Sequence, residues 1–275
     1  MKQLIIGIDI GASMTKAVAL EKSQIIGLKT VTNVNVLNSA QSALKAVLFA
    51  ANREGKDVLR VAVSGGGARL IGETLLGLPV VRIDEIRAIG LGGLELSRKQ
   101  QALVVSMGTG TALVVAVDQG KKIEHIGGTG IGGGAIEGLS RRMLGKSRFE
   151  DIEEMASKGN ANNVDTTVDD VEGEVVGILP KEATASNFKK LDIDSDVNDV
   201  AAAIFTMVSQ VIGVITVMAA RAYHLEEDVV LVGTLIQSKK MAELINGVAK
   251  LFQIKICVPI NGEYCTAIGA AKSIT

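Results

Sequence analysis

The stretch HIGGTGIGGGAIEGL, residues 125–139, contains seven glycines in fifteen residues. Glycine loses more backbone entropy on folding than any other residue, so a cluster this dense indicates either a flexible linker or a backbone that must approach something closely. Flexible linkers are polar and rich in glycine and serine, whereas this stretch contains isoleucine and leucine and continues into the helical pattern AIEGLSRRMLG. A glycine loop that opens into a helix presents backbone N–H groups to an anion. The stretch therefore predicts a phosphate site.

The composition indicates a folded protein with a large core. Hydrophobic residues make up 47% of the 275 residues and charged residues 21%, which argues against global disorder. The formal net charge is −1 and there is no long basic run, so we expect no nucleic-acid partner. Cys257 and Cys265 are too few for a disulfide framework and do not match a zinc spacing. The N-terminal sequence lacks the apolar core of a signal peptide, so we expect a cytoplasmic protein.

Residues 200–220 carry no charge and are long enough to cross a bilayer. The run includes Thr206, Ser209, Gln210 and many small residues, however, which suits a buried or interface helix better. We therefore expect a helix over residues 198–224 and no membrane span. A helix that is apolar on every side exposes much hydrophobic surface, so we also expect it to build a homodimer.

The chain shows the same plan twice: three antiparallel strands, then alternating helices and parallel strands. The first strand of each copy ends in a glycine turn, GIDIGAS in one and SMGTGTA in the other. The polar sequence SRKQQ places the boundary between residues 1–98 and 99–275. Within the first copy we expect a helix from Ser39, as N-cap, to Ala51, and a helix over residues 68–77. Two such halves form a cleft, a preferred ligand site, with a glycine turn on each wall.

Several motifs in order along the chain carry a family resemblance. GIDIGASMTK, MGTGT, GGTGIGGG and VVLVG resemble the acetate kinase/sugar kinase/heat-shock ATPase/actin superfamily. SGGGA, DEIRAIGLGG, FEDIEEMASKGN, ATASNF and YCTAIGAA, together with the opening glycine stretch, resemble the type II pantothenate kinases. A single glycine motif is weak evidence, but this series spans nearly the whole chain.

The resemblance implies an α/β fold of duplicated ribonuclease H-like (actin-like ATPase) domains with a nucleotide cleft between them. It implies ATP-dependent phosphorylation of the primary hydroxyl of pantothenate, the first step of coenzyme A biosynthesis, with ATP and Mg²⁺ as cofactors. ATASNF resembles a family segment near the active-site entrance, and we assign its residues no chemical role. The acidic region 159–196 that contains it has no assignable pattern.

The nucleotide site is expected to combine one carboxylate with the glycine turns. Asp9 ends the first strand, where a kinase of this fold needs a carboxylate to hold Mg²⁺; the alternative is a turn aspartate that bonds its own backbone. Lys16 offsets phosphate charge or is an ordinary solvated strand lysine. Gly233 lies against the adenosine or serves only a strand-to-helix turn. The residues expected to contact the nucleotide are Asp9, Gly11, Ser13, Lys16, Gly108, Thr109, Gly110, Gly130, Gly132, Gly133, Gly134 and Gly233.

The resemblance places the general base on the Asp-Glu pair of RIDEIRAIG. We assign Glu85 as the base that accepts the hydroxyl proton, and Asp84 as the helix N-cap, because aspartate is the better cap residue. Ser106 is expected to reach the acceptor substrate, with a buried strand serine as the alternative. In the similar kinases an arginine before the glycine stretch contacts the carboxylate of pantothenate. His125 stands at that position here, and it lacks the bidentate guanidinium.

The histidine keeps other functions open. One is a kinase of the same fold that acts on a different small hydroxylated acceptor. Another is a non-kinase ATPase that drives a partner, as do the activators of 2-hydroxyacyl-CoA dehydratases; no cysteine for their iron–sulfur cluster lies near the glycine helix. The third is a nucleotide or coenzyme A sensor, against which the presence of Asp9 and Glu85 argues.

Overall fold

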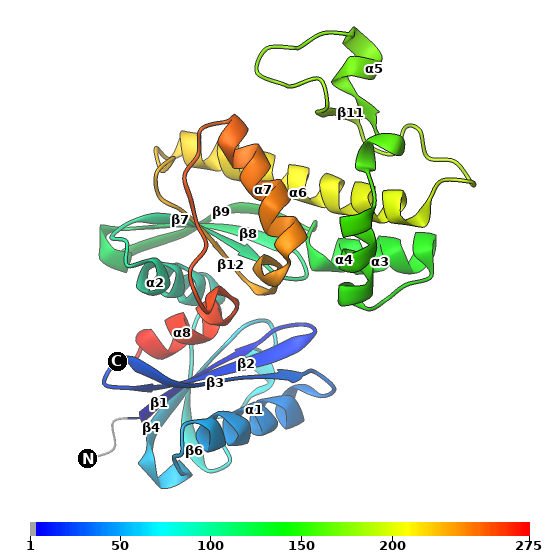
Figure 1. Cartoon of the computed structure of the whole chain (residues 1–275). Coiled ribbons are helices and arrows are strands. Elements are labelled where there is room, and N and C mark those ends of the chain that lie inside the picture. The colour runs from blue at the N-terminus through cyan, green and yellow to red at the C-terminus, as the bar shows by residue number, and fades with distance from the viewer. Residues whose placement is uncertain (1–3) are drawn as a thin grey trace.

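The computed structural model describes residues 4–275 as two α/β halves stacked on each other (Figure 1). The first half is a six-stranded sheet of order β3-β2-β1-β4-β6-β5, and the second a five-stranded sheet of order β13-β12-β7-β8-β9. The strands of the first sheet are β1 (Leu4–Ile10), β2 (Met14–Glu21), β3 (Gln24–Thr32), β4 (Val58–Ser64), β5 (Thr74–Leu75) and β6 (Leu78–Arg82). Those of the second are β7 (Ala102–Met107), β8 (Thr111–Val117), β9 (Lys122–Thr129), β12 (Val229–Val232) and β13 (Ile256–Cys257).

The expected duplication is confirmed strand by strand. In the first sheet β1, β2 and β3 pair antiparallel, and β4 and β6 then add in parallel. In the second sheet β7, β8 and β9 pair antiparallel, and β12 and β13 add in parallel. The glycine turns after β1 and β7 therefore occupy equivalent positions in the two halves.

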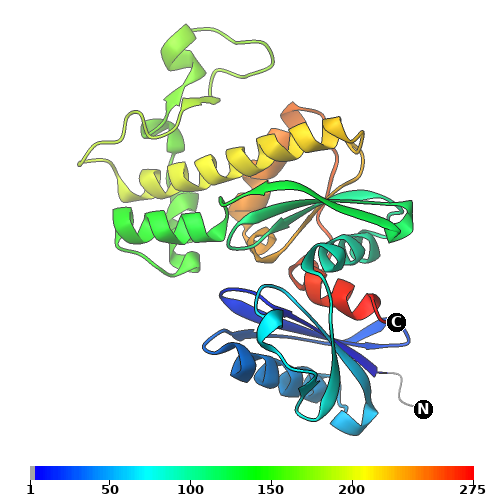
Figure 2. The same ribbon diagram turned by 180° about the vertical axis from the view of Figure 1, so that it is seen from behind.

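Helices cover both sheets and fill the space between them. The helices are α1 (Val36–Ala50), α2 (Glu85–Ser97), α3 (Gly133–Leu144), α4 (Phe149–Lys158), α5 (Val168–Glu172), α6 (Val197–Ala222), α7 (Lys239–Leu251) and α8 (Cys265–Lys272). α1 packs on one face of the first sheet, and α6 packs with α3, α4 and α7 over the second (Figures 1 and 2). Beside them an arm over residues 160–196, with α5 and the short strands β10 (Thr166–Thr167) and β11 (Thr184–Ser186), projects from the second half.

Two helices from different halves make the contact between the sheets. α8 packs on β1, β2 and β4, while α2 packs on β7, β8 and β9 of the other sheet. The two helices meet with almost no side chain between them, since a Cβ on Gly92 would lie 2.0 Å from the Cys265 carbonyl oxygen. A Cβ on Gly269 would lie 1.8 Å from the Ala88 carbonyl oxygen. The glycines of DEIRAIGLGG and YCTAIGAA thus allow backbone contact at the centre of the molecule. The domain boundary between residues 98 and 99 remains a prediction. Helix α2 lies before this boundary but packs on the second sheet, and α8 lies after it but packs on the first.

Two local expectations in the first half are wrong. Residues 68–77 form a short 3₁₀ turn and β5 rather than a helix, because Leu76 and Gly77 both have positive φ and close a two-residue hairpin to β6. A type I′ turn requires this conformation at both central residues. The helix expected to start at Ser39 begins at Val36, because Asn35 is the N-cap and its side chain accepts hydrogen bonds from two backbone N–H groups.

The long uncharged segment forms α6, close to its expected bounds. It is the one helix of residues 4–275 that is long and apolar enough to cross a membrane, but 67% of its most hydrophobic window is buried inside the protein. Phe205 and its buried neighbours contribute to the core of the second half. Val214 and Met218 remain exposed on the helix. Most of the apolar surface that suggested a dimer is therefore buried within the chain itself.

Candidate functional site

Asp9 lies at the end of β1, directly before the first glycine turn. Its neighbours on adjacent strands are Lys16 of β2 and Ser64 of β4. The turn itself is closed by a hydrogen bond from Gly11 N–H to the Met14 carbonyl oxygen. Asn33, which no motif had indicated, donates its side-chain amide to the Gly11 carbonyl. The first glycine turn is thus fixed by residues 9–14 and by the end of β3.

Lys16 connects the two halves of the molecule. The residue is 8% exposed, and its ammonium Nζ donates a hydrogen bond of 2.7 Å to the Thr234 hydroxyl. Thr234 begins a 3₁₀ turn that follows β12 in the second half. A solvated strand lysine, the alternative considered above, is excluded by this burial. The contact brings the first glycine turn next to the loop after Gly233.

Glu85 is the first residue of α2, and the assignment of Asp84 as the N-cap is confirmed. The Asp84 carboxylate accepts a hydrogen bond of 2.9 Å from Arg87 N–H. Glu85 takes no part in capping, so its carboxylate is available to a ligand. The order of strands brings Glu85 to the same side of the sheet as Asp9. Strand β4 lies next to β1, which carries Asp9, and β6, which leads to Glu85, lies next to β4.

The carboxyl groups of Asp9 and Glu85 both have raised pKa values. Burial raises the pKa of Asp9, and the nearby Lys16 charge opposes that effect. The Asp9 residue as a whole is half-buried. Atoms packed around its carboxyl group exclude water from that group, and this disfavours its charged form. Burial, followed by the negative charges of Asp9 and Asp84, raises the pKa of Glu85, although the residue as a whole is exposed. The Asp9 charge therefore acts on the Glu85 carboxyl group, so the two groups lie within electrostatic reach of each other.

The second glycine turn and the opening glycine stretch pack directly against each other. Gly133 N–H donates to the Gly108 carbonyl at 2.9 Å, and Gly134 N–H donates to the Thr109 carbonyl at 3.0 Å. A Cβ on Gly132 would lie 2.7 Å from the Thr109 carbonyl oxygen. Much of the glycine content therefore serves contact between protein segments.

This packing changes which groups remain for an anion. The N–H groups of Gly133 and Gly134 are already used, and Ile131 N–H donates to the Thr129 hydroxyl. Within residues 4–275 the N–H groups of Gly130 and Gly132 have no such partner. Gly130 is exposed, and a Cβ there would meet nothing within 4 Å. The space beside Gly130 is consistent with a ligand.

Gly233 has a structural requirement of its own. Its φ is +97°, and a Cβ would lie 2.3 Å from the Met107 carbonyl oxygen. Any other residue would be strained there and would push the loop after β12 away from β7. Gly233 thereby places Thr234 next to Lys16.

Ser106 and His125 lie on the face of the second sheet that α2 covers. Along β7, Leu103, Val105 and Met107 face α6, so the alternation directs Ser106 to the other face. His125 of β9 pairs with Val114, which belongs to the cluster on the α2 side, and it is exposed. The structure thus brings both residues to the face of Glu85, with His125 on the edge strand.

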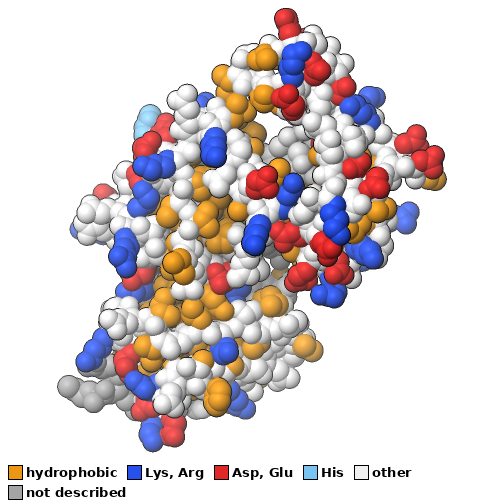
Figure 3. All heavy atoms as spheres, in the orientation of Figure 1, with side chains coloured by type: hydrophobic (Ala, Val, Ile, Leu, Met, Phe, Trp, Pro, Cys, Tyr) orange, Lys and Arg blue, Asp and Glu red, His pale blue; other side chains and the backbone are white. Residues whose placement is uncertain are grey.

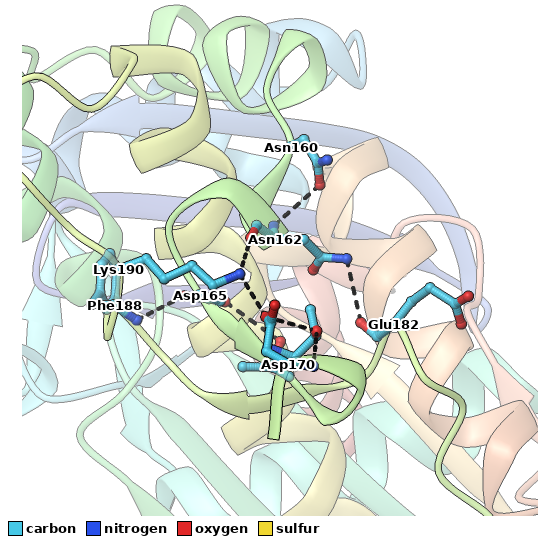
Figure 4. A network of polar contacts seen from close by, with 9 residues as sticks. Asn160, Asn162, Asp165, Asp170, Glu182, Phe188 and Lys190 are labelled. Atoms are coloured by element: carbon cyan, nitrogen blue, oxygen red, sulfur yellow. Dashed lines mark hydrogen bonds and ion pairs between the residues drawn. The ribbon is translucent and has the colours of Figure 1, made fainter. Parts of the chain in front are cut away.

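The ATASNF motif lies in the projecting arm, where Asp165 fixes it. The Asp165 carboxylate is fully buried and accepts hydrogen bonds from Phe188 N–H at 2.7 Å and the Asn187 side chain at 3.2 Å (Figure 4). Burial raises the pKa of this carboxyl group, and these hydrogen bonds oppose the effect. Nearby, Lys190 pairs with Asp170 at 2.5 Å. The network ties the ATASNF motif to the segment around Asp165.

Two hollows lie away from the glycine turns. One of about 260 Å³ lies in the arm, and its lining includes the ion pairs of Lys181 with Asp169 and of Lys190 with Asp170. Another of about 420 Å³ lies at the opposite end of the second sheet, beside Lys99 and Asp228. Figure 3 shows basic and acidic side chains interspersed on one face, with hydrophobic side chains gathered where the two halves meet.

Comparisons with known proteins agree on the fold and the family. The family model described as Fumble matches residues 95–271. A type II pantothenate kinase of Bacillus cereus is 25% identical, with 98% of each chain covered. The activator of the 2-hydroxyisocaproyl-CoA dehydratase from Clostridium difficile, solved with ADPNP, has a TM-score of 0.69 at 14% identity, covering 98% of this chain and 92% of that one. A ROK family glucokinase from Streptomyces griseus, solved with glucose and AMPPNP, has a TM-score of 0.65 at 14% identity and covers 98% of each chain. The expected actin-like ATPase fold is confirmed.

Proposed function

The chain belongs to the Fumble family, and on that premise we propose that it transfers the γ-phosphoryl group of ATP to the primary hydroxyl of pantothenate. Similarity to type II pantothenate kinases over nearly the full length of both chains is the observation that carries this proposal. The product, 4′-phosphopantothenate, belongs to the first step of coenzyme A biosynthesis. The action of the Asp9 charge on Glu85 beside the glycine turns supports the chemistry.

Glu85 is the proposed general base. Its carboxylate accepts the proton of the acceptor hydroxyl as that oxygen attacks the γ-phosphorus and the bond to the β-phosphate oxygen breaks. A raised pKa makes the carboxylate a better proton acceptor at neutral pH. Lys16 offsets phosphate charge from the wall of the first half, and its bond to Thr234 holds that wall to the second.

The site fits a magnesium ion carried by the nucleotide. Among residues 4–275, no cluster of three or more His, Cys, Asp and Glu side chains could enclose a metal. Mg²⁺ is commonly held by one or two carboxylates, water and substrate phosphates, and it neutralises charge on the transferring phosphoryl group. Asp9 supplies one carboxylate next to the glycine turn. We therefore propose Asp9 as the Mg²⁺ residue, with Gly11, Ser13, Gly108, Thr109, Gly110, Gly130 and Gly132 around the phosphates.

The acceptor side is formed by Ser106 and His125 on the α2 face of the second sheet. His125 lacks the bidentate guanidinium of the arginine expected at this position, which favours a second candidate function, the same phosphoryl transfer to another small hydroxylated acceptor. Likeness to the dehydratase activator concerns the fold alone. Cys265 is buried, and burial raises the pKa of its thiol, which disfavours the thiolate that a cluster would need.

A coupled assay of ATP consumption, with and without pantothenate, tests the proposal. We expect pantothenate to stimulate turnover in the parent protein, and Glu85→Gln to lower that turnover by about 10²–10⁴-fold while ATP binding persists. His125→Arg should lower the KM for pantothenate if His125 faces its carboxylate. ATP binding without stimulation by pantothenate would contradict the proposed acceptor, and a panel of small alcohols would then test the second candidate.

We propose further that the protein works in the cytoplasm as a homodimer, without nucleic acid or membrane as a partner. The exposed Val214 and Met218 of α6 support an interface there. Light scattering coupled to size exclusion should give a dimer for the parent and a monomer for Met218→Glu. A monomeric parent would contradict the dimer and leave the catalytic proposal intact.

A further inference from the structure

Ser64 ends β4 as a fully buried residue with an unused hydroxyl group. Its exposed fraction is 0%, and within residues 4–275 its Oγ has no hydrogen-bond partner. Only the Ser140 hydroxyl on α3 shares both properties in that part of the chain. A buried hydroxyl without a partner costs free energy, so its presence beside a candidate site calls for an explanation.

The strand register places Ser64 next to Asp9. The two residues are paired across the parallel strands β4 and β1, and paired residues direct their side chains to the same face. The alternation agrees, because Val63 faces α1 whereas Ala62 faces α2 and α8. Ser64 and Asp9 thus both lie on the side where the two halves meet.

The order of strands places Ser64 between Asp9 and Glu85, the two carboxylates proposed for catalysis. Strand β4 lies between β1, which carries Asp9, and β6, which leads to Glu85. The loop that follows Ser64 closes around Asp9, since a Cβ on Gly65 would lie 2.5 Å from Asp9 Oδ1. Gly67 N–H anchors this loop to the Ile10 carbonyl oxygen at 3.1 Å. The register and the SGGGA loop therefore place Ser64 next to Asp9, although the Ser64 hydroxyl does not hydrogen-bond to the Asp9 carboxylate.

We propose that Ser64 is a positioning residue whose hydroxyl hydrogen-bonds to the ligand shell of the Mg²⁺–nucleotide complex held at Asp9. This inference rests on the ATP site of the proposed function, but not on the identity of the acceptor. Groups that hydrogen-bond to metal ligands orient them, and their loss commonly lowers metal affinity. A hydroxyl can both donate to a ligand oxygen and accept from a bound water, which suits this position.

Titration calorimetry with AMPPNP tests the proposal through binding rather than activity. We expect Ser64→Ala to weaken AMPPNP binding in Mg²⁺ about tenfold and to leave binding in excess EDTA unchanged. Ser140→Ala, which removes the other unpartnered buried hydroxyl, is the matched control and should change neither affinity. The melting temperature of each free variant should equal or exceed that of the parent, because each loses only an unsatisfied group.

The outcomes separate this inference from the proposed function. Unchanged affinity of Ser64→Ala in Mg²⁺ would overturn it, and so would equal losses with and without the metal or an equal loss in Ser140→Ala. Failure of pantothenate to stimulate turnover, in contrast, would overturn only the acceptor. A parent protein that does not bind Mg²⁺–AMPPNP would overturn both.

Discussion

The contact between α2 and α8 predicts that one added methyl group will disturb both stability and turnover. A Cβ at Gly92 would lie 2.0 Å from the Cys265 carbonyl oxygen, whereas ordinary contact begins at 3.4 Å. Both atoms belong to the backbone of a helix or are fixed to it, so no rotamer change relieves the overlap. The two helices must separate by about 1.4 Å.

Two opposing effects determine the size of the change in stability. Gly92→Ala gains about 1 kcal/mol from helix propensity and loses about 1–3 kcal/mol from overpacking. Gly138→Ala in α3 is the matched control, because it has the same propensity gain and a Cβ there meets nothing within 4 Å. The Gly92 variant should therefore be less stable than the Gly138 variant by about 1–3 kcal/mol, measured by thermal and urea unfolding.

The same displacement should reduce turnover, because α2 carries Glu85 as its first residue while α8 packs on the sheet that carries Asp9. A misplacement of about 1 Å can cost about 10²-fold in rate, so we expect kcat of Gly92→Ala to fall toward that level. Gly138→Ala should keep the parent kcat. Equal melting temperatures above that of the parent, with equal kcat values for the two variants, would refute the inference that backbone contact between α2 and α8 positions Glu85 relative to Asp9.

Three other predictions concern the carboxylates. Glu85→Gln should lower kcat by about 10²–10⁴-fold, whereas Asp84→Ala should cost about 1 kcal/mol of stability through the lost N-cap and keep most of the activity; equal kinetic losses would contradict this division. The pKa of Glu85 is raised and the base must be ionised, so kcat/KM should fall with decreasing pH around a pKa above that of an ordinary glutamate. A pH profile that is flat down to the ordinary glutamate range would refute this. Asp165→Ala should lower the free energy of unfolding by about 2 kcal/mol, because buried donors lose a charged acceptor. Asp165→Asn should lower the free energy of unfolding by less, since its amide oxygen still accepts a hydrogen bond. Equal urea midpoints for both variants and the parent would show that the network does not contribute to stability.

Features encoded within short segments were predictable from the sequence. The buried strands, the glycine turns after Asp9 and Met107, and the capping of α2 by Asp84 depend on neighbouring residues. The hairpin over residues 74–79 was missed, because the apolar pattern of LIGETLLG also suits a helix and only the positive φ of Leu76 and Gly77 decides between them. Asn33 and Thr234 belong to no motif, and nothing local indicates that they fix the glycine turn and Lys16.

The amino-acid sequence alone was enough to predict the duplicated α/β plan, the family and the carboxylates proposed for catalysis. These depend on hydrophobic periodicity and on motifs that each lie within a few consecutive residues. Tertiary structure alone decided why the glycines are needed: Gly92 and Gly269 for a helix contact, and Gly132 for contact with the second turn. It also decided that the N–H groups of Gly133 and Gly134 are already used. Such facts depend on distances between segments far apart in the chain, which only packing of the whole molecule sets.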